Sequence, residues 1–116
     1  MKDFVNKYYT NKKNELESKF NNEFSDFEAI KAIVSFIVNE IENGLNFGKK
    51  IDAEHIQFKF DKNLFKAINI DNTDRFSLQA SHACDDLKVF NIIAEKSYVS
   101  TLLESYTHTI KIKYPQ

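Results

Sequence analysis

The clearest pattern of apolar residues runs from residue 26 to residue 43. Its apolar members recur at spacings of three and four residues, and they are Phe27, Ile30, Val34, Ile37 and Ile41. Such spacing places side chains on one face of an α-helix. Ser25 followed by Glu28 is a capping-box pattern, and Gly44 stands where helices commonly end. We therefore predict a helix over 26–43, and its broad apolar surface predicts a central position in the domain.

Residues 2–21 carry a weaker helical pattern. Apolar residues recur there mostly at spacings of four or seven, at Val5, Tyr9, Leu16 and Phe20. This spacing predicts a helix with a single apolar stripe. The polar residues around Thr10 are poor helix formers, so they predict a break or a frayed turn at that point. Asn21-Asn22 is the expected end.

After residue 54 the period of the pattern changes from 3.6 to 2, which predicts strands. The apolar residues of the three alternating segments are Ile56, Phe58 and Phe60, then Phe76, Leu78 and Ala80, then Ile110, Ile112 and Tyr114. Asp61-Lys62-Asn63 and residues 71–74 are turn signals. Pro115 is expected to end the last strand, since proline cannot donate to a ladder.

Three segments are less clear. Residues 64–70 fit a short helix or a strand, and 87–94 favour a buried strand although their apolar residues also fit a helix. Residues 99–106 show a helical stripe, while their Val, Thr and Tyr content favours a strand. The whole pattern predicts one α+β domain over 1–116, with two N-terminal helices packed on a mainly antiparallel sheet formed by the C-terminal half.

Length and composition agree with one globular domain, because 116 residues with 42% hydrophobic and 28% charged side chains are ordinary values. The lone Cys84 excludes an intramolecular disulfide and a thiolate metal cage, which favours a reducing compartment. No apolar leader follows Met1, and the longest apolar stretch, 29–38, is shorter than the roughly 20 residues that cross a bilayer. We expect a cytoplasmic protein without a membrane span.

The charge pattern argues against direct nucleic-acid binding. The net charge is −1, and Arg75 is the only arginine, whereas phosphate and guanine contacts favour arginine. Acidic residues around 23–42 and 71–86 could mimic nucleic-acid phosphates, but the helix dipole and turn chemistry also account for them. The heavy use of Lys, Asn, Ile and Phe is typical of an AT-rich genome and favours a bacterium or its mobile elements.

Arg75 followed by His82 resembles the catalytic pattern of the small helical HEPN-type ribonucleases. The resemblance implies that His82 acts as general acid or base on an RNA 2′-hydroxyl while Arg75 holds the phosphate, with both on one face. A helix places residues seven apart on one side, about two turns apart. The strand predicted for 76–80 separates them by roughly 23 Å and puts them on opposite faces, so this enzyme is the weaker alternative.

The densest run of potential metal ligands is His82, Cys84, Asp85 and Asp86. His82 and Cys84 would project from the same side of an extended segment, and a distant histidine would have to complete a tetrahedral site. Cys84 needs an activating neighbour to serve as a nucleophile, and the spacing supplies none. We therefore predict neither a metal nor a cofactor.

The remaining signals favour protein recognition. Tyrosine covers apolar area while its hydroxyl stays in water, so the five tyrosines are candidates for a contact surface: Tyr8, Tyr9, Tyr98, Tyr106 and Tyr114. Ile110 and Ile112 join them if the last strand is a sheet edge that a partner or a second copy can extend; a central position is the other possibility. The sequence thus favours a non-enzymatic protein-binding module, such as a small inhibitor or accessory protein, with a homodimer or homo-oligomeric structural protein as an alternative.

Overall fold

A computed structural model describes the backbone of residues 2–17, 24–70, 73–101 and 104–113. Its helices are α1 (Lys2–Glu17), α2 (Phe24–Asn43), α3 (Lys62–Ala67) and α4 (Phe76–Leu87), and its strands are β1 (Lys49–Lys50), β2 (His55–Phe60), β3 (Ile93–Thr101) and β4 (Glu104–Lys113). Two short 3-10 helices, η1 (Thr73–Arg75) and η2 (Lys88–Phe90), flank α4. The predicted α+β class, with helices in the N-terminal half and an antiparallel sheet in the C-terminal half, is confirmed.

The sheet has the strand order β1-β2-β4-β3, and each of its pairings is antiparallel. Ile112 of β4 lies opposite Ile56 of β2 on one side and Ala94 of β3 on the other. Strand β4 is therefore central, and the edge position considered for Ile110 and Ile112 does not occur.

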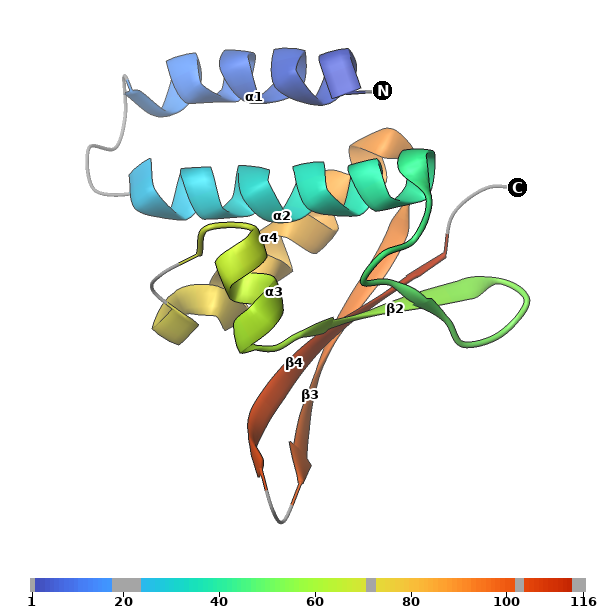
Figure 1. Ribbon diagram of the computed structural model, residues 1–116. Helices are drawn as coiled ribbons and strands as arrows, with labels where there is room; N and C mark the ends of the chain where they lie inside the picture. The colour runs from blue at the N-terminus through green and yellow to red at the C-terminus, as the bar shows by residue number, and fades with distance from the viewer. Residues whose placement is uncertain (1, 18–23, 71–72, 102–103, 114–116) are drawn as a thin grey trace.

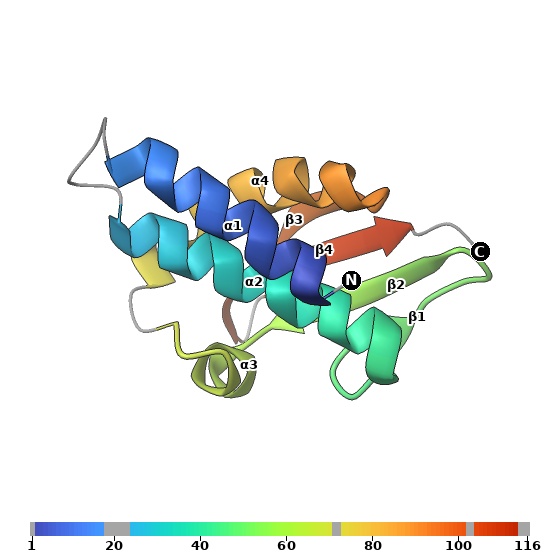
Figure 2. The same cartoon turned by 90° about the horizontal axis from the view of Figure 1, so that it is seen from above.

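Three layers make up the molecule (Figure 1). Seen from above, α1 lies across α2 and α4, which in turn cover one face of the sheet (Figure 2). The sheet turns its apolar side chains toward these helices, and Ile56, Phe58, Phe60, Ile110 and Ile112 are at most 1% exposed. Burying such side chains contributes about 1.5–3 kcal/mol each, so this interface supplies much of the stability.

Residues 76–80 form the first turns of α4, and the predicted strand there is wrong. Phe76, Ala80, Ala83 and Leu87 are buried at spacings of four and three residues, as one face of a helix requires. Leu78, which the alternating pattern placed with the core, is 46% exposed. The segment also lacks Val, Ile and Thr, the residues that favour strands.

The less clear segments also resolve. Residues 62–67 form α3, because Asp61 caps this helix by accepting a hydrogen bond from the Leu64 N–H at 3.0 Å; the expected turn at 61–63 is a helix start. The preference for strand over 87–94 holds only from Ile93 onward, and the strand preference for 99–106 agrees with β3 and β4.

Both N-terminal helices differ from the predictions at their ends. Helix α1 continues through Thr10, whose hydroxyl donates to the Asn6 carbonyl at 2.8 Å, so the expected break is absent. Helix α2 begins at Phe24, which places Ser25 inside its first turn. The expected end at Asn21-Asn22 lies outside the described residues. Within the described ranges, no helix has the length and apolar character needed to span a bilayer.

Glu40 organises the connection from α2 to the sheet. This side chain is 2% exposed and accepts hydrogen bonds from the backbone N–H groups of Asn46, Phe47 and Gly48, the last two at 2.6 and 2.9 Å. A buried carboxylate surrounded by N–H donors is stable because the donors replace its hydration. Glu40 thus holds the loop that leads into β1.

We predict that Glu40→Gln lowers the free energy of unfolding by about 1–3 kcal/mol, because the amide loses the charge-assisted hydrogen bonds. The control is Glu42→Gln on the exposed side of the same helix, with an expected change within about 0.5 kcal/mol. Urea unfolding followed by circular dichroism measures both variants. Equal effects of the two substitutions would contradict this account of Glu40.

Candidate functional site

Helices α3 and α4 follow one another along the chain and are separated by residues 68–75, which include η1; we call the two helices the α3–α4 unit. Helix α3 is followed by Asn69, which adopts a left-handed conformation with φ of 60°; asparagine tolerates this conformation better than most residues. The next residue, Ile70, is 7% exposed and donates its N–H to the Phe65 carbonyl at 2.9 Å. The β3–β4 hairpin follows α4 along the chain (Figure 1).

One face of α4 is available at the surface. Its buried side packs on α2 and β3, whereas Ser77, Leu78, His82 and Asp85 are exposed on the other side. Arg75, directly before the helix, is exposed as well, and α3 adds the exposed Lys62, Asn63 and Lys66. The unit therefore displays hydroxyl, imidazole, amide and cationic groups on a rigid support.

The helix changes the relation between Arg75 and His82. Both side chains are exposed. Seven residues of α-helix correspond to about 10 Å with nearly the same direction of projection, but Arg75 belongs to η1 and is the N-cap residue of α4, so the interval is not wholly α-helical. The helix replaces the opposite faces expected of a strand, and the ribonuclease role of the two residues stays a prediction. The small helical fold that the resemblance implied is different, since this chain contains a four-stranded sheet.

The run from His82 to Asp86 separates onto different sides of α4. Cys84 and Asp86 are buried while His82 and Asp85 are exposed. Burial raises the pKa of the Cys84 thiol to about 11, so the thiol is protonated at neutral pH and is a poor nucleophile. In the part of the chain that the structure describes, no group of three or more His, Cys, Asp or Glu side chains could hold a metal ion.

The two other histidines lie on the sheet, away from this run. His55 Nδ1 is 2.9 Å from Asp52 Oδ1, in a surface pair that also includes the N–H of His55. His108 packs edge-on against Phe76, with ring centroids 4.9 Å apart. Burial and the charge of Lys96 lower the pKa of His108, which favours the neutral imidazole.

The residues predicted for protein contact occupy different environments. Ile110 and Ile112 are 0% exposed and belong to the core, because β4 is central and turns them toward the helices. Tyr98 lies on β3 opposite His108, and Tyr106 lies on β4. The side chains of these two tyrosines, and the whole of Tyr114, lie outside the described part of the chain.

A buried carboxylate behind the exposed face of α4 ties this helix to α1. Asp86 is 6% exposed; it accepts hydrogen bonds from the Tyr9 hydroxyl at 2.9 Å and from Lys12 Nζ at 3.0 Å, and Tyr8 Oη lies at 3.4 Å. Burial and the Asp86 charge raise the pKa of Tyr9. We call Tyr8, Tyr9, Lys12 and Asp86 the α1–α4 clasp, and sequence reasoning missed it because its partners lie more than 70 residues apart.

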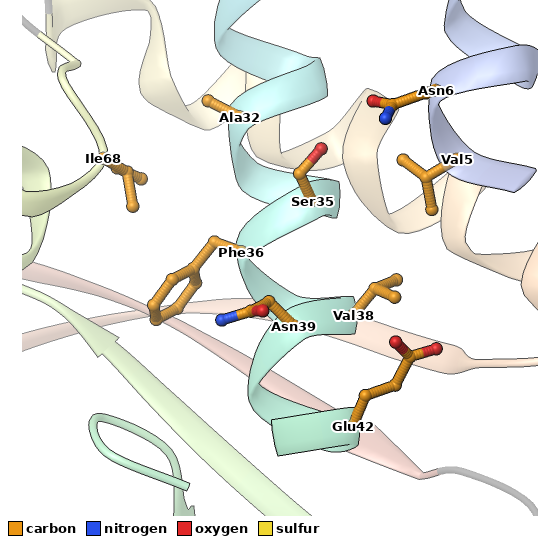
Figure 3. Close-up of a pocket in the computed structure, with 9 residues that line it drawn as sticks. All are labelled: Val5, Asn6, Ala32, Ser35, Phe36, Val38, Asn39, Glu42 and Ile68. Atoms are coloured by element: carbon orange, nitrogen blue, oxygen red, sulfur yellow. The ribbon is translucent and has the colours of Figure 1, made fainter. Parts of the chain in front are cut away.

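A groove runs along α2 between α1 and the end of α3 (Figure 3). Its volume is about 350 Å³, and its lining residues are Val5, Asn6, Ala32, Ser35, Phe36, Val38, Asn39, Glu42 and Ile68. Sequence reasoning predicted a broad apolar surface for α2. It did not show that α1 and α3 leave the space between them open.

Comparisons of the chain with protein-family models, with curated proteins and with solved structures gave no match. The candidate site is therefore interpreted from its own geometry.

We predict that Asp86→Asn lowers the free energy of unfolding by about 1–3 kcal/mol, because the amide cannot form the charged pair with Lys12. Asp85→Asn is the matched control; Asp85 is exposed, and its oxygen is 3.8 Å from Lys88 Nζ in a surface pair, so we expect a change within about 1 kcal/mol. Thermal and urea unfolding measure both variants. A larger loss for Asp85→Asn would contradict the clasp.

The clasp also predicts the pH dependence of stability. The Tyr9 pKa is raised above its ordinary value of 10.0, and the Lys12 pKa is raised above 10.5 because the Asp86 hydrogen bond and charge outweigh the effect of burial. A raised folded-state pKa contributes stability below the ordinary pKa, and this contribution is lost as pH rises through the folded-state value. Stability should fall above about pH 10, and less steeply in Asp86→Asn. Curves of unfolding free energy against pH that have the same slope in the wild type and in Asp86→Asn would contradict this prediction.

Proposed function

We propose that this chain is a non-enzymatic nucleic-acid-binding module that inserts α4 into the major groove of duplex DNA. The supporting observation is that α3 and α4 are successive helices, joined by residues 68–75 and followed by the β3–β4 hairpin. In helix–turn–helix proteins, whose connecting turn is shorter than this one, the first helix crosses the phosphate backbone and the second reads base edges. Since fold alone does not define function, the proposal also rests on the exposed face of α4.

The dimensions and side chains of α4 suit this role. Its 12 residues correspond to about 18 Å of helix, and a major groove about 12 Å wide admits a helix. Arg75 at its start can pair with guanine or phosphate, and Leu78 can contact a thymine methyl group. His82 lies two turns further along the same exposed side.

The charges of this unit predict weak, moderately salt-dependent binding. Lys62, Lys66 and Arg75 are exposed cations of the α3–α4 unit and its ends, and the exposed Asp61, Asp74 and Asp85 balance them in number. Three phosphate contacts correspond to a slope of about −3 in a plot of log affinity against log salt concentration. In the sequence, the low charge argued against nucleic-acid binding. The succession of α3 and α4 is the observation that favours it.

We predict that the protein binds a random-sequence DNA duplex at low salt, and that Arg75→Ala weakens binding about tenfold and reduces the salt slope by about one. Lys7→Ala is the matched control, because Lys7 is an exposed cation on α1 and its removal changes the net charge equally. Fluorescence anisotropy over a salt series measures both. Absence of binding at low salt, or equal weakening by Lys7→Ala, would contradict the proposal.

RNA cleavage is an alternative outcome for the same face. If wild-type protein cleaves RNA without added cofactor and folded His82→Ala and Arg75→Ala proteins do not, the ribonuclease hypothesis replaces the binding proposal. Unchanged RNA after incubation with the wild-type protein supports binding without catalysis. Circular dichroism of the variants establishes that each is folded.

Protein binding, which the sequence favoured, is the second candidate function. Three large apolar side chains are exposed where α1 begins and α4 ends: Phe4 at 57%, Val89 at 48% and Ile93 at 61%. The Phe4 ring packs edge-on against Phe90, which follows Val89 in η2, with centroids 5.6 Å apart. Exposed apolar groups of this kind support an interface. A second copy is the simplest partner, since proteins that place a helix in the major groove commonly bind two half-sites as dimers.

We predict that the wild-type protein forms a dimer as its concentration rises, and that Val89→Glu with Ile93→Glu abolishes the dimer while the far-UV spectrum is retained. Two buried charges at an interface are strongly unfavourable, which is the reason for the expected loss. Leu78→Glu on the exposed face of α4 is the control and should leave the dimer intact. Light scattering at two protein concentrations measures the molar mass. A monomeric mass at both concentrations would contradict the homodimer proposed as the second candidate.

A further inference from the structure

We infer that the outer edge of β1 binds an extended acidic peptide, which adds a strand to the sheet. Strands β1 and β3 stand at opposite edges of the order β1-β2-β4-β3, and α4 packs on β3. Strand β1 lies beside the C-terminal end of α2 (Figure 2). The inferred site is therefore separate from the exposed face of α4, and its occupation does not depend on DNA binding.

The hydrogen bonds of β1 indicate which of its backbone groups face outward. Lys50 pairs with Ile56, and the next residue, Ile51, donates its N–H to the His55 carbonyl at 3.0 Å. Hydrogen-bonded and non-hydrogen-bonded pairs alternate in an antiparallel ladder, so the N–H and C=O of Lys50 point away from β2. Among the strands that the structure describes, none pairs with this side of β1. An added strand can exchange a pair of hydrogen bonds with Lys50.

The segment that leads into this edge is held in place from inside the molecule. The buried Glu40 accepts hydrogen bonds from the N–H groups of Phe47 and Gly48. Gly48 approaches the sheet so closely that a Cβ atom at this position would lie 2.6 Å from the Phe58 ring. Because the edge is ordered before binding, the protein loses little conformational entropy when a peptide adds to it.

Exposed apolar side chains stand on both sides of this edge. The three large ones in the segment are Leu45 at 38%, Phe47 at 44% and Ile51 at 47% exposure. The Phe47 ring packs edge-on against Phe36 of α2, with centroids 5.7 Å apart, and so lies on the helix side of the sheet. Ile51 lies opposite His55, which precedes the inward-facing Ile56, so Ile51 projects from the other side. A peptide at the edge therefore meets apolar surface on both of its faces.

The charges at the edge favour an acidic peptide. Lys49 and Lys50 are exposed. The carboxylates that follow them are engaged in surface pairs, Asp52 with His55 at 2.9 Å and Glu54 with Lys113 at 3.3 Å. In the part of the chain that the structure describes, no carboxylate pairs with either lysine. Lysines on an edge discourage addition of a basic strand and attract an acidic one.

The register of β1 defines the order of residues in the peptide. Lys50 lies opposite Ile56 on the helix side, and Lys49 lies opposite Gln57 on the other side. Adjacent peptide residues that oppose these two lysines should therefore both be acidic. The peptide residue before them opposes Ile51, and the residue after them comes beside Phe47, so both should be apolar. The peptide that fits is apolar–acidic–acidic–apolar.

A second copy of this chain is a poorer occupant of the same edge. Twofold antiparallel pairing through the outward groups of Lys50 would place this residue opposite its own copy, and like charges directly opposite each other are destabilising. The expected partner is therefore a segment of another protein.

The test uses three capped peptides, which are GSVEEVSG, its permutation GSEVVESG and the basic GSVKKVSG. Titration of ¹⁵N-labelled full chain with GSVEEVSG should shift the amide signals of Lys49, Lys50 and Ile51, with a Kd of about 0.5 mM. The permutation has the same composition and charge, and it should bind about fivefold more weakly because valines then oppose the lysines. The basic peptide should give no saturable shifts.

Variants of the edge separate its backbone from its charge. Lys50→Pro removes the outward N–H, which an edge strand tolerates, and should weaken GSVEEVSG at least about tenfold. Lys50→Gln keeps the N–H and should weaken it only about threefold. Lys49→Glu with Lys50→Glu should weaken it at least about tenfold. Lys59→Glu is the charge control, because Lys59 is an exposed cation of β2 beyond the residues that pair with β1, and it should leave the affinity unchanged.

Three results would overturn the inference. These are the absence of saturable shifts at β1, equal binding of GSVEEVSG and its permutation, and equal affinities of Lys50→Gln and a Lys50→Pro protein that circular dichroism shows to be folded. If Lys50→Pro does not fold, the two-glutamate variant decides, and an affinity equal to that of Lys59→Glu counts against the site. Shifts at β1 caused by vesicles of phosphatidylcholine and phosphatidylserine, but not by GSVEEVSG, would also overturn it in favour of a lipid surface.

Discussion

The packing of α4 between α2, α1 and β3 is the constraint on which the rest of the structure depends. Phe76, Ala80, Ala83 and Leu87 fill the interface and are at most 1% exposed, and the two alanines permit a close approach of the helices. Lys96 of β3 reaches back to α4, with its Nζ 2.9 Å from Ser77 Oγ. Because the buried side of α4 is held from three directions, its opposite side is presented to solvent in a fixed orientation.

Two buried carboxylates stabilise this arrangement from within. Glu40 holds the loop between α2 and β1 through backbone N–H groups, and Asp86 holds α1 against α4 through two tyrosines and a lysine. Their environments differ, since Glu40 faces neutral donors and Asp86 faces a cation. Each replaces lost hydration with specific donors, as burial of a charge requires. Because Glu40 and Asp86 are buried, they do not belong to the acidic surface that the sequence analysis considered as a mimic of nucleic-acid phosphates.

Local signals predicted much of the fold. The long helical stripe of α2 and the alternation around Phe58 and Ile112 were interpreted correctly, because each pattern extends over several residues and agrees with residue preference. Residues 76–80 were misinterpreted because a five-residue alternation was preferred to the twelve-residue helical pattern that includes it. The absence of Val, Ile and Thr between Phe76 and Leu87 is the signal that favours the helix.

The candidate site was less accessible to sequence reasoning. Arg75 and His82 were identified, but their shared side followed only from the helix, and the left-handed turn at Asn69 has no distinctive sequence pattern. The α1–α4 clasp and the groove depend on tertiary contacts between distant segments, such as the pair Tyr9 and Asp86, 77 residues apart. Local periodicity carries no information about such contacts.

The central claim is that α3 and α4 form the surface that meets duplex DNA. Chemical-shift mapping of ¹⁵N-labelled full chain with a short duplex at low salt tests it most directly. The account predicts that the largest amide shifts lie in α3, in residues 73–82 and in the β3–β4 hairpin, with little change in the outer turns of α1. Shifts centred on α1, or no shifts in α3 or α4, would contradict it.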